Sequence, residues 1–350
     1  MRAVVLKRHG APHVLRVTRE PDPLPAPGSV LVRVEAIGIN YAEILSRKGL
    51  YGWAPRRPYI PGMEAAGRIE AVGDGVDRRP GEAVAVGAQF GCYAERVVVP
   101  AAQALPAVQG FGVEENAAFP VNWMTAWVGL MEMARLRPAD RVSVSPAGGG
   151  VGTAAVQIAA ALGCEVVALA GSDEKLVNVR GLGARRTVNY RRPGWREALA
   201  EGGPVDVALE MVGGDVFRGV RDALAPFGRV VVAGYADLDY SLWNPLSWWR
   251  ALRGIPRMSL KRMFMGSNGM LSTHLGYLLD DAERLERVWR ELVDFVRRHD
   301  LRPQVGHVLP FSMVAEAHRL IESRKSYGKV VLRVQGTSPP ASAGGPGSRS

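Results

Sequence analysis

The sequence is poor in the residues that usually hold metals. Its 350 residues include two cysteines, Cys92 and Cys164, and six histidines. Two cysteines exclude a disulfide framework and any zinc site built from four cysteines. No two histidines form a ligand pair, since His9 and His13 have helical spacing but lie in a Gly/Pro-rich segment. We therefore expect no bound metal and a reducing, cytoplasmic location.

Long apolar runs are missing as well. No stretch of about 18 uncharged apolar residues occurs, which argues against a transmembrane helix, and the apolar run after Met1 is too short for a signal peptide. The net charge is +10, but the basic residues are spread along the chain and no nucleic-acid-binding motif is present. We expect no nucleic-acid partner and interpret the charge as compositional bias plus a cofactor that carries phosphates.

Two patterns of secondary structure follow one another along the chain. The first 120 residues contain strand-like runs such as 30–37 and 95–99, separated by Gly/Pro turns, which predicts a partly closed β-barrel. Later residues alternate strands (141–145, 165–169, 205–209, 229–233) with helices such as 153–162. This alternation predicts an α/β fold with a doubly wound parallel sheet.

The end of the chain departs from this alternation. Residues 241–275 interrupt it, and a helix at 281–298, a strand at 305–309, a helix at 312–323 and a strand at 329–332 follow. Residues 336–350 are rich in Gly, Ser and Pro, so we expect them to be disordered.

A glycine-rich loop lies between the strand 141–145 and the helix that follows it. Glycines allow the chain to turn sharply and to approach a pyrophosphate, and the N-terminus of a helix offers free N–H groups and a partial positive charge. The context of a strand before and a helix after is the one that a dinucleotide-binding loop requires. The predicted cofactor loop consists of Ala147, Gly149, Gly150, Val151 and Gly152.

The end of the second strand should select the cofactor. Enzymes that use NAD place an acidic residue there for the ribose 2′-hydroxyl, whereas this chain has Gly171 and Ser172, followed by Lys175. Together with Tyr190 near the end of the next strand, a hydroxyl and a cation suit a 2′-phosphate, which favours NADPH. Ser172 can also be a helix N-cap, and Asp173 leaves NADH possible.

Several motifs together resemble the medium-chain dehydrogenase/reductase superfamily, in its quinone oxidoreductase branch. They span residues 1 to about 333, and two of them, 121–127 and 274–278, are most similar to the subgroup around the synaptic vesicle membrane protein. The other motifs are Gly38 to Glu43, Tyr59 to Gly67, Ala147 to Gln157, Gly171 to Lys175 and Gly328 to Leu332.

The resemblance implies a GroES-like catalytic domain (1–120 and 298–335), a Rossmann cofactor domain (121–297) and a cleft between them, with dimers common. It places Asn40 and Thr125 near the nicotinamide, and Val212, Gly234 and Tyr235 near its ribose. The cofactor would further contact Gly149, Gly150, Val151, Ser172, Lys175 and Tyr190.

The resemblance also identifies the positions where zinc-dependent members carry metal ligands. Here Asn40 and Met63-Glu64 replace the cysteine and the His-Glu pair, and neither an amide nor a thioether is a plausible ligand for catalytic zinc. We therefore predict a zinc-independent enzyme in which Glu64 has a structural role.

Without a Lewis acid, an acceptor that is already electrophilic is the better substrate. We predict hydride transfer from NADPH to a quinone or an α,β-unsaturated carbonyl, with the developing oxyanion stabilised by hydrogen-bond donors and then protonated. Asn40 is the first candidate for positioning, and Tyr41 and Tyr51 are candidate donors, although all three can instead be structural. Two alternatives stay open: an NADPH-binding protein with little turnover that acts through partner or membrane-surface contacts, and an enoyl-thioester reductase.

An aromatic and basic segment fits two interpretations. It can contact a membrane surface or a partner, or it can form a wall of the substrate cleft or a dimer contact, which we favour. The segment contains Trp243, Trp248, Trp249 and Phe264, interspersed with Arg250, Arg253, Arg257, Lys261 and Arg262.

Overall fold

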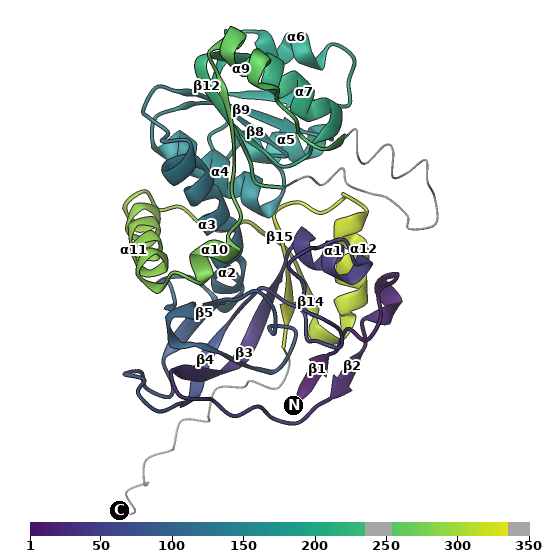
Figure 1. The fold of residues 1–350 in the computed structure, drawn as a ribbon, viewed down its shortest axis with the longest axis vertical. Helices are drawn as coiled ribbons and strands as arrows, with labels where there is room; N and C mark the ends of the chain where they lie inside the picture. Colours follow the sequence, from purple (N-terminus) through teal and green to yellow (C-terminus); the bar gives the residue numbers. More distant parts are fainter. Residues whose placement is uncertain (235–253, 335–350) are drawn as a thin grey trace, which may run out of the picture.

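The computed structural model describes residues 1–234 and 254–334. Within these ranges the chain forms two units, one above the other in Figure 1, each built around its own large sheet. The upper unit takes its strands from the middle of the chain, whereas the lower unit takes strands from both ends. No helix in the described part combines the length and apolarity needed to cross a bilayer.

The upper unit contains a six-stranded sheet in which every neighbouring pair is parallel. Its strands are β8 (Arg141–Ser145), β9 (Glu165–Ala170), β10 (Arg186–Asn189), β11 (Val205–Glu210), β12 (Leu224–Val232) and β13 (Gly269–Ser272). They lie in the order β10-β9-β8-β11-β12-β13. From β8 the chain first adds strands on one side, β9 and β10, and then on the other side, beginning with β11. In a doubly wound sheet, a binding crevice lies at the point where the strand order reverses in this way. The predicted Rossmann fold is confirmed.

The lower unit is built on one long strand, β3 (Ser29–Ile39). One edge of β3 pairs with β4 (Glu64–Val72), and the other edge pairs with β6 (Arg96–Pro100) and β15 (Lys329–Arg333). The sheet is completed by β5 (Ala83–Gly87), β7 (Ala104–Pro106) and β14 (Val305–Pro310), beside a small sheet of β1 (Arg2–Val4) and β2 (Val17–Arg19). Strands from both ends of the chain thus share one sheet, while the domain boundaries near 120 and 298 remain a prediction.

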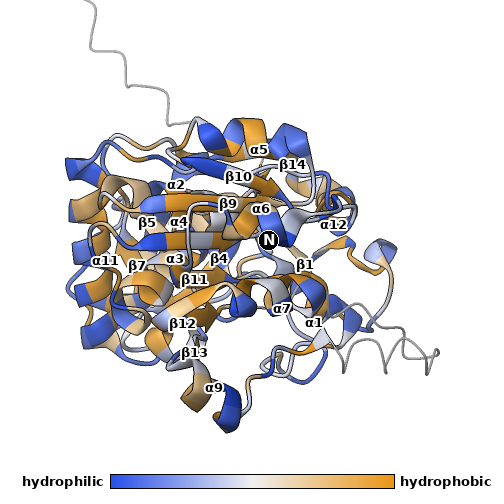
Figure 2. Ribbon diagram, turned by 90° about the horizontal axis from the view of Figure 1, so that it is seen from above, coloured by the Kyte–Doolittle hydropathy of each residue, from blue (hydrophilic) through white to orange (hydrophobic). Residues whose placement is uncertain are grey.

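Helices cover both sheets with their apolar faces. The helix α11 (Ala282–Arg298) buries residues three or four positions apart and turns its hydrophilic side outward, as Figure 2 shows. Its Trp289 meets Phe119 edge to face, with ring centroids 5.2 Å apart. The remaining α-helices are α1 (Tyr41–Lys48), α2 (Val113–Ala118), α3 (Pro120–Trp127), α4 (Gly150–Ala161), α5 (Asp173–Arg180), α6 (Trp195–Ala200), α7 (Gly214–Asp222), α9 (Leu260–Gly266), α10 (Gly276–Leu279) and α12 (Val314–Glu322).

One predicted feature is wrong in part. The sequence predicts that residues 241–275 interrupt the alternation, but α9 and β13 continue it, and β13 adds a sixth parallel strand next to β12. The run 269–272 is short and only partly buried, so its sequence carries little strand signal. The predicted Tyr235, the tryptophans Trp243, Trp248 and Trp249 with Arg250 and Arg253, and the tail 336–350 lie outside the described residues.

Candidate active site

The glycine-rich loop joins β8 to α4. The strand ends at Ser145 and the helix begins at Gly150, with Gly149 as its N-cap residue. Its N-cap residue Gly149 has no side chain to cap α4, so N–H groups of the first turn can bind the oxygens of a pyrophosphate. Ala147 is buried and donates its N–H to the Leu169 carbonyl at 2.8 Å, and Val151 packs on the core.

The glycines of this loop meet different surroundings. A Cβ added to Gly152 would lie 2.1 Å from the carbonyl oxygen of Pro146, and one added to Gly150 would lie 2.1 Å from Nδ2 of Asn122. At Gly149 no atom lies within 4 Å of such a Cβ. Strand, helix and loop therefore need glycine at 150 and 152 to pack, whereas Gly149 faces open space that a phosphate group can enter.

The carboxyl end of β9 carries the residues expected to bind the adenosine ribose. The hydroxyl of Ser172 caps α5 and accepts a hydrogen bond from the backbone N–H of Lys175 at 3.5 Å. A Cβ on Gly171 would lie 3.1 Å from the Tyr190 hydroxyl and 3.0 Å from Nε of Arg191. A phenol, a guanidinium and a helix N-cap thus surround this strand end.

The charges at this end favour an additional anion. Burial lowers the pKa of Lys175, and the nearby Arg191 guanidinium lowers it further, so two cations repel each other here. Asp173, the acid that left NADH possible, is an ion-pair partner of Arg192 and accepts a hydrogen bond from Asn189 at 3.1 Å. The negative charge of Asp173 is therefore balanced, and Lys175 and Arg191 place two further cations at this strand end.

The strand ends of β11 and β12 lie side by side at the same edge of the sheet. Buried Glu210 accepts hydrogen bonds from the N–H groups of Val212 (2.8 Å) and Gly213 (3.1 Å), which fixes the loop after β11. A Cβ on Gly234 would lie 3.9 Å from Cβ of Met211. The structure thus brings together the predicted Val212 and Gly234.

A buried polar cluster surrounds Asn40, the N-cap residue of α1. Its Nδ2 donates to Oε1 of Glu64 at 2.9 Å, and its Oδ1 accepts from Nζ of Lys329 at 2.6 Å. Lys329 also forms an ion pair with Glu64, and Glu43 completes a capping box with Asn40. These four residues are at most 8% exposed. Because both ends of the Asn40 amide have protein partners, this side chain is fixed in the cluster, and its predicted contact with nicotinamide or substrate remains a prediction.

The cluster contains a carboxyl group that titrates near neutral pH. Burial raises the pKa of Glu43 to about 7, against the opposing effects of Lys329 and of hydrogen bonds from the N–H groups of Asn40 and Met63. The cluster can therefore gain or lose one proton close to physiological pH.

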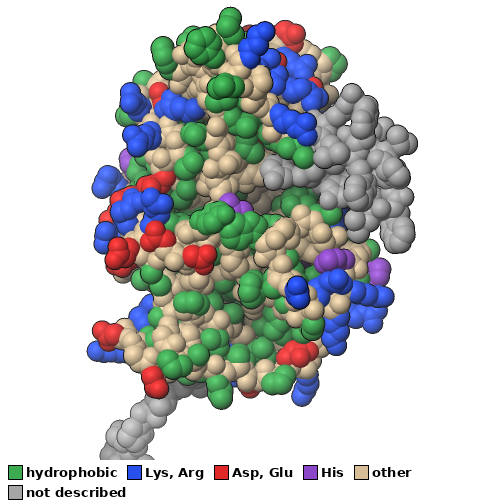
Figure 3. All heavy atoms as spheres, viewed as in Figure 1, with side chains coloured by type: hydrophobic (Ala, Val, Ile, Leu, Met, Phe, Trp, Pro, Cys, Tyr) green, Lys and Arg blue, Asp and Glu red, His purple; other side chains and the backbone are tan. Residues whose placement is uncertain are grey.

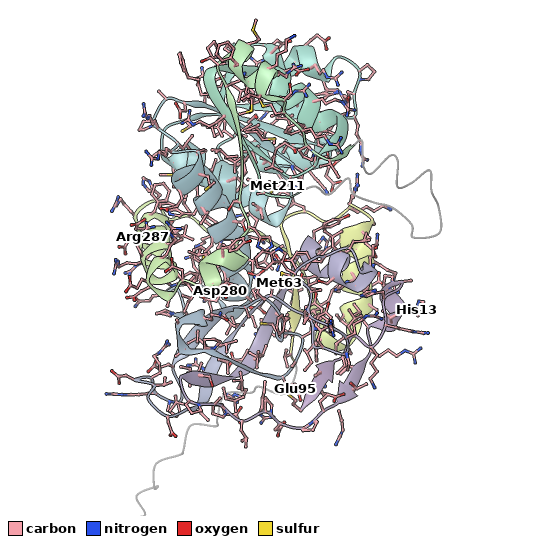
Figure 4. The ribbon with its side chains drawn as sticks, in the orientation of Figure 1. His13, Met63, Glu95, Met211, Asp280 and Arg287 are labelled. Carbon is pink, nitrogen blue, oxygen red and sulfur yellow. The ribbon has the colours of Figure 1, made fainter. Side chains whose placement is uncertain are left out.

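The residues at the positions where zinc-dependent members of the superfamily carry metal ligands do not fit zinc. Met63 is buried where the two units meet, below Met211 in Figure 4. The Glu64 carboxylate already has a cationic partner in Lys329, and the Asn40 oxygen accepts from the same ammonium. Over residues 1–234 and 254–334, no group of three or more His, Cys, Asp and Glu is arranged to bind a metal ion.

The helix α3 connects the cluster with the phosphate loop. The N–H of Val121 donates to Oε2 of Glu64 at 2.8 Å, and the hydroxyl of Thr125 donates to the Val121 carbonyl at 2.6 Å. Thr125, predicted to lie near the nicotinamide, is therefore one helical turn from a residue bound to the cluster.

The chain just before β15 makes a second connection. The N–H of Gly328 donates to the Gly148 carbonyl at 2.9 Å, while the next residue, Lys329, belongs to the cluster. Nearby, Nζ of Lys175 donates to the Arg324 carbonyl at 2.6 Å. The cofactor loop and the buried cluster are thus anchored to the same short segment.

Tyr51 forms a hydrogen-bonded pair with His274. The Tyr51 hydroxyl lies 3.0 Å from Nε2 of His274, and Nδ1 of the same ring accepts the N–H of Gly276 at 3.1 Å. Because Nδ1 is an acceptor and burial lowers the pKa of His274, the proton of the neutral ring lies on Nε2 and is donated to the Tyr51 oxygen. The Tyr51 hydrogen is then available to another acceptor. The ring of Trp53 stacks on His274 at a centroid distance of 4.2 Å.

A comparison with known proteins shows the family. The synaptic vesicle membrane protein VAT-1 homolog of Rattus norvegicus is 33% identical over 343 residues, which cover 95% of this chain and 84% of the relative. The chain belongs to the medium-chain dehydrogenase/reductase superfamily. The alcohol dehydrogenase GroES-like domain matches residues 26–109, and a family described as zinc-binding dehydrogenase matches residues 182–332.

Solved structures of this superfamily have the same fold. The quinone oxidoreductase of Thermus thermophilus, solved also in complex with NADPH, is 35% identical with a TM-score of 0.78, covering 95% of this chain and all of that one. An NAD-dependent alcohol dehydrogenase is 33% identical with a TM-score of 0.80 and the same coverage. The protein is therefore an oxidoreductase of the superfamily with a nicotinamide-binding fold, in its VAT-1-like subgroup.

Several residues of the site were not predicted from the sequence. Lys329 and His274 lie inside motifs that carried the family resemblance, and Arg191 directly follows Tyr190. Lys329 and His274 were assigned no role, because their partners Asn40 and Tyr51 are far away in the sequence. Tyr41, the second candidate donor, begins α1 and is half-buried, whereas it is Tyr51 that pairs with His274.

Proposed function

We propose that the protein is an NADPH-dependent reductase that transfers a hydride to a quinone or an α,β-unsaturated carbonyl without zinc. The observation that carries the proposal is the Tyr51–His274 pair, which presents a neutral hydroxyl donor in a nicotinamide-binding fold. Burial, followed by the charge of Glu43, raises the pKa of Tyr51 to about 12, so the phenol keeps its proton at neutral pH.

The proposed chemistry needs a proton on the acceptor oxygen. When bound, NADPH supplies a hydride for the β-carbon of an enone or for a quinone. The electron pair would then move to the carbonyl oxygen, and Tyr51 would donate its hydroxyl proton there. A quinone would give the hydroquinone, and an enone would give an enol that tautomerises to the saturated carbonyl. The Nε2–H of His274 stabilises the phenolate that forms, because it already donates to that oxygen. Solvent returns the proton to Tyr51.

Zinc independence rests on the chemistry of the donor set. A metal at the family's usual position would have to displace the Lys329 ammonium from Glu64 and be coordinated by an amide and a thioether. An acceptor that is already activated needs no such Lewis acid.

The preference for NADPH rests on Lys175, Arg191 and Tyr190 around the ribose end. Replacing Lys175 by Met should lower the ratio of kcat/KM for NADPH to that for NADH by about fivefold, since one unit charge next to a phosphate contributes about 1 kcal/mol in water. Arg180→Gln, at the other end of the same helix, is the matched control. An unchanged ratio of the two kcat/KM values in Lys175→Met would show that Lys175 does not select the cofactor.

A homodimer in the cytoplasm is part of the same proposal. In the described part of the chain, β13 is the last strand of the parallel sheet. Exposed apolar side chains gather beside it at the top of Figure 3, from Phe227, Leu260, Phe264 and Met265. A second copy of the chain can cover this edge and the apolar surface together. In sedimentation experiments Phe264→Asp should weaken the dimer, whereas Leu24→Asp, an equally exposed position in the lower unit, should not.

The test of the proposed activity is steady-state oxidation of NADPH and NADH with a panel of quinones, enones and enoyl thioesters. We expect turnover of quinones and enones with NADPH. Tight NADPH binding without turnover of any acceptor would instead favour the low-turnover binding protein, and turnover confined to thioesters would favour an enoyl-thioester reductase.

A further inference from the structure

A basic hollow lies next to Tyr51 on the lower unit. It has a volume of about 520 Å³ and is lined by Lys7, His9, Arg56 and Arg57 together with Tyr51 and small residues, with no acidic residue among them. Figure 3 shows blue and purple side chains gathered on the right-hand flank of this unit.

The walls of the hollow are fixed by the fold. Leu6 forms an antiparallel β-bridge with Tyr59, and its N–H donates to the Tyr59 carbonyl at 2.8 Å, which brings the segments around Lys7 and Arg57 together. The His9 ring packs so closely against Gly49 at the end of α1 that a Cβ there would lie 2.4 Å from Nδ1. The basic groups thus project from anchored backbone.

Among the described residues, the cations in this hollow have no counter-charge. Lys7, Arg56 and Arg57 make no ion pair or side-chain hydrogen bond with another residue in the part of the chain that the structure describes. Other arginines of this unit, such as Arg47 and Arg96, have carboxylate partners. Burial lowers the pKa of His9, and the nearby positive charge of Arg57 lowers it further. Cations that converge without a partner are stabilised by an anionic ligand.

We propose that this hollow binds an anionic group, such as a phosphate or a sulfonate, on the acceptor substrate. The inference rests on the proposed function, because Tyr51 both lines the hollow and forms the pair with His274. Acceptors that carry a negative group beside their quinone or enone are then better substrates than uncharged ones of the same skeleton.

The test compares 1,2-naphthoquinone with 1,2-naphthoquinone-4-sulfonate, with NADPH as the reductant. The double variant Arg56→Gln/Arg57→Gln should lower kcat/KM for the sulfonate about tenfold more than for the uncharged quinone, mainly through KM. The control is Arg290→Gln, an exposed arginine on α11 that should leave the ratio of the two acceptors unchanged. An equal change for both acceptors in the double variant would overturn the proposal.

A binding measurement separates this proposal from the proposed function. In calorimetry with NADPH at saturation, so that the cofactor's own phosphate sites are filled, the wild type should bind inorganic pyrophosphate and the double variant should bind it about tenfold more weakly. If no acceptor is reduced but this difference is seen, only the proposed reaction fails. If the wild type reduces quinones but neither pyrophosphate binding nor sulfonate selectivity depends on Arg56 and Arg57, the anion site fails.

Discussion

The phosphate loop and the buried cluster around Asn40 meet at Gly328 and Lys329, yet they rely on different interactions. The loop around Gly149 offers backbone N–H groups at a helix N-terminus, and its N-cap residue has no side chain to cap them. The cluster instead aligns buried charges, with Lys329 against Glu64 and Asn40 between them. Backbone groups bind an anion at almost no cost in desolvation, whereas buried charges are stable only when every partner is present.

This difference predicts different responses to mutation. Changes in the loop should alter cofactor binding and leave the fold intact, wherever the new side chain has room. Changes in the cluster should act first on stability, because removal of one charge leaves its partner buried and unpaired.

The largest effect is expected for Lys329→Met. It would leave the fully buried Glu64 carboxylate without its cation, so the free energy of unfolding should fall by about 3–5 kcal/mol in urea denaturation. Lys325→Met, at an exposed position four residues earlier, should have little effect. If Lys329→Met unfolds at the wild-type midpoint, the cluster is not the stabilising element described above.

The next effect concerns the reaction. Tyr51→Phe should lower kcat/KM for a quinone or an enone by about 10²–10³, the usual loss for one donor to a developing oxyanion, while the Kd for NADPH stays the same. Tyr41→Phe, which removes the other candidate hydroxyl, should cost less. A greater loss of kcat/KM in Tyr41→Phe than in Tyr51→Phe would show that Tyr41 is the proton donor.

A pH dependence of stability should follow from Glu43. Its pKa in the folded state, about 7, lies above the ordinary value of 4.5, so the folded protein binds this proton more tightly than the unfolded chain. The corresponding stabilisation, at most about 3 kcal/mol, is complete below pH 4.5 and is lost as the pH rises through 7.

Urea denaturation between pH 5 and pH 8 can measure this contribution. The glutamine in Glu43→Gln cannot ionise, so the free energy of unfolding should fall less steeply with pH in this variant. Glu174→Gln, which changes an exposed residue of α5, should show the same dependence on pH as the wild type. Equal slopes for wild type and Glu43→Gln would show that Glu43 does not titrate in this range.

The smallest effect is expected for a substitution at Gly149 in the cofactor loop. The backbone at Gly149 has φ −92°, which alanine adopts readily, and an added Cβ meets no protein atom within 4 Å. Gly149→Ala should therefore unfold like the wild type but bind NADPH about tenfold more weakly, because its methyl group enters the space expected for the phosphates. Gly152→Ala should instead be destabilised by its clash with the Pro146 carbonyl. Unchanged NADPH affinity in Gly149→Ala would show that the phosphates do not bind at this position.

The two regions also differ in how well the sequence predicts them. The cofactor loop is contiguous, and the alternation of strands and helices around it predicted the parallel sheet. Asn40 was identified through a family resemblance, but nothing in the spacing could show that Lys329, 289 residues later, would donate to it. The Tyr51–His274 pair spans 223 residues and was missed for the same reason. Contacts between distant residues follow from the packing of the two units, which no local pattern records.

The reaction proposed for this protein is hydride transfer to an activated acceptor without zinc. The most direct test uses NADPH with deuterium at both C4 positions and an enone, with protein treated with a chelator and its zinc content measured. We expect deuterium at the β-carbon of the saturated product, a primary isotope effect, and full activity at far less than one zinc per chain. Loss of activity on chelation with recovery on addition of zinc, or a product without deuterium, would contradict it.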